Sequence, residues 1–223
     1  MTVIGGGMPI RIENTDLVYF PVPKIACTSV KTAILEHNDP ERLARLAEST
    51  VNGRQMHVHD VYPSRRMRVT DRLVFARGRW TALVRDPVRR FVSGYRNRIV
   101  HHRDLDNAPV DALVARGLSP DPTLEEFARR LGDYVAASRA VRHHFAPICA
   151  YLGDRPQSFA RIFALEEVED FLAFVREAGA HLALPHEQTG GPRLSVDDLT
   201  SATRRDVEVF YDQDYRVWGT HFR

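Results

Sequence analysis

Two lysines stand close together in a segment rich in hydroxyl side chains, PVPKIACTSVK, at residues 21–31. Every other member of the 31 Lys and Arg residues in the chain is an arginine. A loop that brings N–H groups and hydroxyls to a helix start can bind an anion, because the first N–H groups have no partner within the helix and its dipole favours negative charge there. Lys24, shortly before Thr28, adds a mobile positive charge. The segment indicates an anion site; a solvated lysine beside an ordinary helix cap is the alternative.

The residues around these lysines predict a strand, a tight loop and a helix. The apolar run LVYFPVP at 17–23 ends in prolines, as a buried strand would. From Thr28 on, apolar residues recur at helical spacing, and Thr28 or Ser29 is placed to cap the first turn. Lys31 falls within this helix, and we expect it on the helix surface. The pattern GxxxxGK[ST] is absent, which disfavours ATP or GTP binding in the usual P-loop mode.

A second strand followed by a helix occupies residues 80–100, WTALVRDPVRRFVSGYRNRIV. The run TALV is the expected strand, and Asp86 and Pro87 begin the helix. Arg85 stands at the carboxyl end of this strand, as Lys24 stands after the first one, and ligands of open α/β sheets bind beyond those ends. Together Lys24 and Arg85 are suited to hold two phosphate-type groups of one ligand. The alternative is that Arg85 pairs with Asp86 or another carboxylate.

Apolar and polar side chains of this second helix fall on opposite faces. The face expected in the core carries Phe91, Val92, Tyr95 and Ile99. The opposite face carries Arg90, Ser93 and Asn97.

The rest of the chain continues the alternation of strands and helices, which predicts an α/β fold with a mainly parallel sheet. A strand is expected at 162–165, followed by a helix that Gly179 ends. The residues after 195 are expected to be helical up to about Gly219.

Two features are expected between these stretches. Thr123 and Glu126 form a capping box for a helix, whereas the Pro- and Gly-containing stretch 101–122 reads as a long loop or an irregular insert. The basic stretches 64–72 and 96–103 either receive an acidic acceptor or are solvated faces.

The composition is that of a soluble globular protein, for which we expect a single domain over residues 1–223. A formal charge of +2 is too balanced for a general nucleic-acid binder. Cys27 and Cys149 lack metal-ligand spacing, so we expect reduced thiols and no metal, and His143 and His144 do not change this. No apolar run approaches the ~20 residues of a membrane span and no signal-type segment opens the sequence, which favours a cytoplasmic protein without membrane contact. Nothing in the sequence indicates an oligomeric state.

The segments VPKIACTSVKTAIL and LVRDPVRRFVSGYRN together resemble the carbohydrate sulfotransferases that use 3′-phosphoadenosine 5′-phosphosulfate (PAPS). The branch with heparan sulfate 2-O-sulfotransferase and the chondroitin and HNK-1 enzymes is the most similar, and weaker echoes extend the resemblance over residues 17–219. It implies a P-loop-like three-layer fold of a mainly parallel sheet flanked by helices. It also implies two groups of ligand-binding residues: Lys24, Ala26, Cys27, Thr28 and Ser29 for the 5′-phosphosulfate, and Arg85 and Ser93 for the 3′-phosphate.

The same resemblance implies a catalytic base. The segment MHVHDVYP at 56–63 is similar to the H-x-H segment of the heparan sulfate enzyme, in which the second histidine corresponds to His59, with His57 beside it. Imidazole titrates near neutral pH and is suited to accept a hydroxyl proton. Asp60 departs from the family pattern and either orients the ring or is solvated. Two histidines without a role, or a carboxylate base, remain the alternatives.

These assignments imply transfer of a sulfuryl group from PAPS to a hydroxyl in one in-line step without a metal, with PAP as the product. His59 would take the hydroxyl proton and Lys24 would offset charge on the leaving oxygen. The acceptor is expected to be a carbohydrate or a glycosylated small molecule, and the sequence does not choose between them. A kinase-like phosphotransferase and a non-catalytic nucleotide-binding module are the alternatives from other classes.

Overall fold

The computed structural model describes residues 9–51, 53–185 and 192–223. They form two compact units, each built from separate stretches of the chain. The first comprises the described residues of Met1–Val84 and Ala150–Glu187 with Arg223, and the second those of Arg85–Cys149 and Gln188–Phe222. One domain over residues 1–223 stays a prediction.

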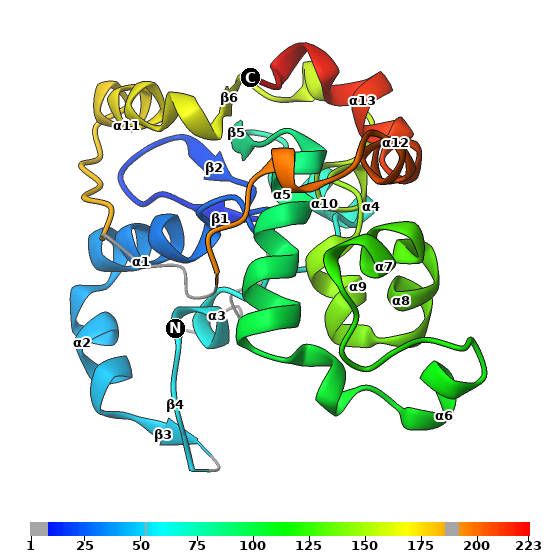
Figure 1. Cartoon of the computed structure of the whole chain (residues 1–223). Coiled ribbons are helices and arrows are strands. Elements are labelled where there is room, and N and C mark those ends of the chain that lie inside the picture. The colour runs from blue at the N-terminus through cyan, green and yellow to red at the C-terminus, as the bar shows by residue number, and fades with distance from the viewer. Residues whose placement is uncertain (1–8, 52, 186–191) are drawn as a thin grey trace. The chain divides into compact units, whose positions relative to one another are not determined.

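The first unit is built on a four-stranded sheet in the order β1-β2-β5-β6 (Figure 1). Its strands are β1 (Ile10–Arg11), β2 (Leu17–Tyr19), β5 (Arg79–Val84) and β6 (Arg161–Ala164). β2, β5 and β6 run parallel, whereas β1 pairs antiparallel with β2. The expectation of an α/β fold with a mainly parallel sheet is confirmed, as are the three strands expected from the sequence. β5 is buried from Trp80 to Val84, as an inner parallel strand covered on both faces must be.

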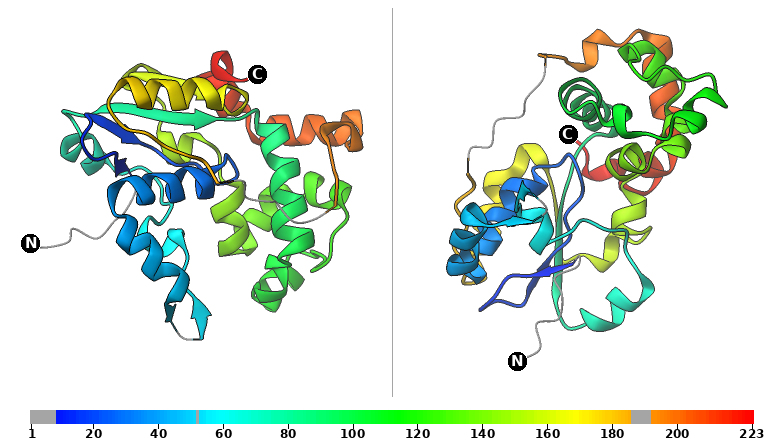
Figure 2. Two further views of the ribbon diagram at one scale, coloured as in Figure 1. Left: turned by 90° about the vertical axis from the view of Figure 1, so that its left-hand side faces the viewer. Right: turned by 90° about the horizontal axis from the view of Figure 1, so that it is seen from below.

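Helices flank this sheet, and α1 and α11 lie on the same side of it (Figure 2, right). The remaining elements of the unit are α1 (Cys27–Asn38), α2 (Pro40–Glu48), β3 (Thr50–Val51), β4 (Arg54–Gln55), α3 (Val58–Val61), α4 (Val69–Val74), α10 (Cys149–Leu152, with its first residue in the second unit), the 3-10 helices η3 (Pro156–Ser158) and η4 (Leu165–Glu167), and α11 (Val168–Glu177). Gly179 follows α11 with φ 103°, a conformation that favours glycine, so the expected end of this helix is confirmed.

The second unit is helical. Its elements are α5 (Pro87–Gly94), the π-helix η1 (Tyr95–His101), η2 (Asp104–Asn107), α6 (Val110–Val114), α7 (Leu124–Arg129), α8 (Leu131–Ala137), α9 (Arg139–Phe145), η5 (Val196–Asp198), α12 (Ser201–Phe210), α13 (Asp212–Trp218) and η6 (Gly219–His221). The expected start of α5 is confirmed, because the Asp86 carboxylate accepts a hydrogen bond from the Arg89 N–H at 2.9 Å and Pro87 occupies the first turn.

Aromatic rings from several helices make the core of the second unit. Phe127 of α7 packs on Phe91 of α5 and on Phe145 of α9, with ring centroids 5.8 and 5.0 Å apart. The four residues expected on the apolar face of α5 and η1 are all buried. Stretch 101–122, expected as a long loop or an irregular insert, contains the short helices η2 and α6 between irregular residues, and Leu105 and Leu113 bury their side chains in this core.

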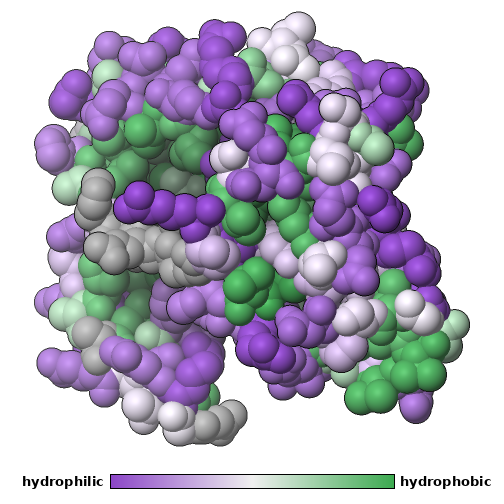
Figure 3. Space-filling model, in the orientation of Figure 1, coloured by the Kyte–Doolittle hydropathy of each residue, from purple (hydrophilic) through white to green (hydrophobic). Residues whose placement is uncertain are grey.

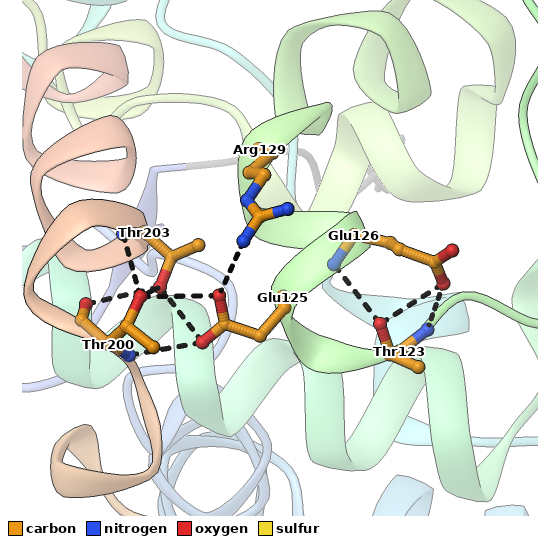
Figure 4. Close-up of polar contacts among 6 residues, drawn as sticks. All are labelled: Thr123, Glu125, Glu126, Arg129, Thr200 and Thr203. Atoms are coloured by element: carbon orange, nitrogen blue, oxygen red, sulfur yellow. Dashed lines mark hydrogen bonds and ion pairs between the residues drawn. The ribbon is translucent and has the colours of Figure 1, made fainter.

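Hydrogen bonds join α7 to the start of α12 (Figure 4). The Glu125 carboxylate accepts from the backbone N–H and hydroxyl of Thr200 and from the hydroxyl of Thr203. These bonds hold the Glu125 pKa below its usual value. The capping box expected at Thr123 and Glu126 is present in the same turn.

Arg90 does not lie on an exposed face of α5 as expected. Its side chain is 1% exposed, and its Nη2 donates to the carbonyl oxygens of His144 and Ala146 at 3.1 and 2.8 Å. These carbonyls belong to the last turn of α9 and to its C-cap residue, where no further helical N–H reaches them. The Arg90 side chain therefore caps the carboxyl end of α9 from within the core.

We expect Arg90→Met to destabilise the protein by about 1–3 kcal/mol, because the two buried carbonyls lose their donor. The matched control is Arg89→Met, because Arg89 is the residue next to Arg90 and is exposed. This control should change stability by less than about 0.5 kcal/mol. Urea unfolding of the full chain measures both. Equal stability of the two variants would contradict this role of Arg90.

Candidate active site

The loop between β2 and α1 turns the chain through two left-handed residues. Lys24 has φ 68° and Ala26 has φ 46°, and neither is a glycine. A residue with a Cβ adopts this conformation at a cost on the order of 1–2 kcal/mol. The flanking residues Val22 and Ile25 are fully buried, which holds the loop in place. Backbone strain of this kind is typical of functional sites such as active sites and ligand-binding loops.

Helix α1 starts directly after this turn without a side-chain cap. Ala26 occupies the cap position, and the first turn has no acidic residue. The expectation that Thr28 or Ser29 caps the helix is therefore wrong. The N–H groups of the first turn have no acceptor within the helix, so the helix start favours an anion.

A cavity of about 450 Å³ opens beside the helix start. Its walls are Ala26 and Ser29 from the α1 side, Val168 and Leu172 of α11, and the segment from Leu182 to Pro185. Figure 3 shows apolar side chains around a hollow on this face. The volume lies within the roughly 300–1,000 Å³ common for small-molecule sites.

His59 of α3 lies against another side of α1. Its Nε2 is 3.1 Å from Thr28 Oγ1, and its Nδ1 is 3.0 Å from Lys31 Nζ. Lys31 Nζ also donates to Ser64 Oγ at 2.5 Å. Thr28 and Lys31 are three residues apart and share a face of α1, so one helix face presents both groups to the ring.

Lys31 is not on the helix surface as expected, because its side chain is 0% exposed. Burial lowers the pKa of its ammonium to about 8, and the nearby Cys27 opposes this shift. Sequence reasoning missed this contact with His59; the helical spacing from Thr28 to Lys31 and the rarity of lysine in this chain are the features that could have indicated it.

His57 and Asp60 support the segment that carries His59. The His57 ring stacks on the His59 ring with centroids 5.0 Å apart, and its Nδ1 lies 3.4 Å from the His59 N–H. The Asp60 carboxylate accepts from the His57 N–H at 2.8 Å and pairs with Arg54 at 2.8 Å. These contacts lower the pKa of Asp60. The Asp60 carboxylate thus takes part in the capping box of α3. The sequence interpretations, in which Asp60 orients the ring or is solvated, did not include this role.

Arg85 and Ser93 belong to the second unit. Arg85 directly follows the last residue of β5, and Ser93 lies on α5 with its side chain half-buried. Because β2 and β5 are parallel, their carboxyl ends meet at one edge of the sheet. The neighbouring Asp86 carboxylate accepts hydrogen bonds from the Arg89 N–H and from the Tyr215 hydroxyl.

The two basic stretches are partly paired with nearby carboxylates. Arg65 forms two bonds to the buried Asp71, at 2.6 and 2.8 Å, and Arg98 forms two to Asp104, at 2.7 and 2.8 Å. These arginines help to order their own segments.

Over residues 9–51, 53–185 and 192–223 no group of three or more His, Cys, Asp or Glu side chains is placed to hold a metal ion. Neither Cys27 nor Cys149 forms a disulfide within the described part of the chain. Among the helices described for this chain, none is long and apolar enough to cross a membrane.

Residues 10–219 match the model of the sulfotransferase family, and the chain therefore belongs to this family. Sulfuryl transfer is the reaction that defines the class. A search of curated proteins and one of solved structures gave no match.

The left-handed turn before α1 makes a prediction about stability. We expect Ala26→Val to be less stable than Ala26→Gly by on the order of 1–2 kcal/mol, because a β-branched residue resists positive φ whereas glycine adopts it freely. Urea unfolding of both variants measures the difference. Equal stability would show that the loop relaxes and holds no strain.

Proposed function

We propose that this sulfotransferase transfers the sulfuryl group of PAPS to a hydroxyl of a carbohydrate or of a glycosylated small molecule. The observation that supports it most is the uncapped start of α1 with Lys24 before it and His59 3.1 Å from Thr28. This arrangement combines an anion site with a candidate base. The resemblance to the carbohydrate branch, with its P-loop-like fold, supports the donor and the acceptor class.

The loop residues bind the 5′ side of the donor in this proposal. The N–H groups of Cys27, Thr28 and Ser29 donate hydrogen bonds to the phosphosulfate at the helix start, and Ala26 provides the left-handed turn that precedes them. PAPS supplies an activated sulfuryl group on a phosphate leaving group. Preorganised donors of this kind act without rearrangement during the reaction, and loss of one typically costs on the order of 10²–10³ in rate.

Two further parts of the ligand have proposed partners. The cavity bounded by Ser29 and Leu172 accepts the nucleoside, since it adjoins the loop and combines apolar side chains with the polar Ser29 and Glu169. Arg85 and Ser93 bind the 3′-phosphate, as the family motif implies, and an arginine fork suits a phosphate.

His59 accepts the proton of the attacking hydroxyl, and His57 supports it by stacking. Lys24 offsets the charge that grows on the leaving oxygen as PAP departs. A compact ammonium on a flexible stem can follow that oxygen, whereas a guanidinium is suited to fixed two-point binding. None of these roles needs a metal.

Thermal unfolding with nucleotides tests the donor assignment. We expect PAP without metal to stabilise the protein more than ADP, AMP or ATP with Mg²⁺. At about 100 times Kd a ligand adds about 2.7 kcal/mol, which is roughly 5–10 °C in Tm for a chain of this size. Stronger stabilisation by ATP with Mg²⁺ would contradict the proposal and indicate a kinase-type site.

The contribution of the 3′-phosphate is tested by variants. Arg85→Ala and Ser93→Ala should abolish the advantage of PAP over ADP while ADP binding stays as in the wild type. Arg89→Ala is the matched control, since Arg89 lies on α5 with Ser93 and is exposed. If neither Arg85→Ala nor Ser93→Ala changes the preference, another group binds this phosphate.

We expect Lys24→Arg to fold normally and to lose most turnover, because the charge remains but cannot follow the leaving oxygen. PAP formation from PAPS, with a panel of glycans and glycosylated small molecules as acceptors, measures it. Wild-type turnover in this variant would remove the role given to Lys24.

A further inference from the structure

Lys31 is a buried cation in direct contact with the proposed base. Its side chain is 0% exposed, and its Nζ lies 3.0 Å from His59 Nδ1 and 2.5 Å from Ser64 Oγ. The other ring nitrogen, Nε2, faces Thr28 Oγ1 at 3.1 Å. Both nitrogens of the ring are therefore engaged, and the protonation of Lys31 decides what each of them can do.

An ammonium only donates hydrogen bonds. With Lys31 protonated, Nδ1 must accept, so a neutral His59 carries its proton on Nε2 and donates to Thr28. In this form Nε2 has no lone pair for a substrate proton. With Lys31 as a neutral amine, its lone pair accepts the Nδ1–H instead. Nε2 then has its lone pair directed at the loop, where the Thr28 hydroxyl donates to it.

We propose that Lys31 is a positioning residue that sets the tautomer of His59 and receives the Nδ1 proton when His59 acts as the base. The proposal rests on the role of His59 given above. The acceptor oxygen bonds to sulfur as the bond from sulfur to the PAP oxygen breaks. The hydroxyl proton forms a bond to Nε2, and the Nδ1 proton passes to Lys31 Nζ. The step ends with a neutral ring beside an ammonium, so protons and charge balance.

The burial of Lys31 makes this exchange accessible near neutral pH. Desolvation lowers the pKa of the ammonium to about 8, against an opposing effect of Cys27 on the same helix. From α3, the titratable groups at the pair are His57, stacked on the ring, and Asp60, which is held by Arg54 and the His57 N–H. The base-competent form is therefore absent well below pH 8 and is populated as the pH rises through about 8.

The experiment uses NMR of the full-length protein labelled with ¹⁵N at the lysine Nζ and at the histidine ring nitrogens. Lys24 and Lys31 give the two lysine Nζ signals of the sequence. We expect the Lys31 signal to titrate at about pH 8. In the same range the His59 proton should move from Nε2 to Nδ1. A Lys31 that stays an ammonium up to about pH 10, or a His59 with one tautomer throughout, would overturn the proposal.

Variants assign the signals and serve as controls. Lys31→Met should abolish the tautomer change, whereas Lys24→Met should leave it intact. A change that persists in Lys31→Met also overturns the proposal. If Lys31→Met does not fold, the wild-type spectra still decide. No nucleotide is added, so a failure of PAP to bind would contradict the proposed function without affecting this result.

Discussion

The site depends on one backbone constraint: the loop after β2 must turn into α1 through left-handed residues at Lys24 and Ala26 without a glycine. This turn leaves the first N–H groups of α1 without a side-chain cap and places Lys24 directly before them. Burial of Val22 and Ile25 on either side of Lys24 supplies the packing energy that offsets the strain. The fold therefore stabilises a conformation that the loop would not adopt alone.

The first turns of α1 serve two purposes on two sides. Ala26 and Ser29 line the cavity beside α11, whereas Thr28 and Lys31 contact His59. Residues three apart share a helix face, so this division follows from the helical period. In the proposed reaction the nucleoside lies on one side of the helix start and the base on the other, with the transferred group between them.

Three strands, the mainly parallel sheet, the starts of α5 and α7 and the end of α11 could be predicted from the sequence, because apolar periodicity, prolines and capping residues are local features. The helix start that we propose as the anion site lies in the segment that the sequence indicated, since Lys24 and the hydroxyls are close together in the chain. The burial of Lys31 and Arg90 was not. Each is a charged residue whose partners lie far along the chain. Lys31 contacts His59 and Ser64, and Arg90 donates to the carbonyls at the end of α9. Periodicity describes a helix face but not what packs against it.

The prediction that a side chain caps α1 was wrong for a related reason. Thr28 has the residue type of a helix cap, but α1 starts one residue earlier, at Cys27, and the Thr28 hydroxyl instead lies 3.1 Å from Nε2 of His59, 31 residues away. Local propensity is overridden when a distant group offers a better partner, and such departures are expected at functional sites.

A crystal structure with PAP tests the central claim most directly. The account requires the 5′-phosphate at the start of α1, within hydrogen-bond distance of the N–H groups of Thr28 and Ser29, with Lys24 Nζ at the bridging side. The nucleoside should fill the cavity beside Leu172, and the 3′-phosphate should contact Arg85 and Ser93. A PAP molecule bound away from α1, or with its 3′-phosphate at the start of α1, would contradict the account.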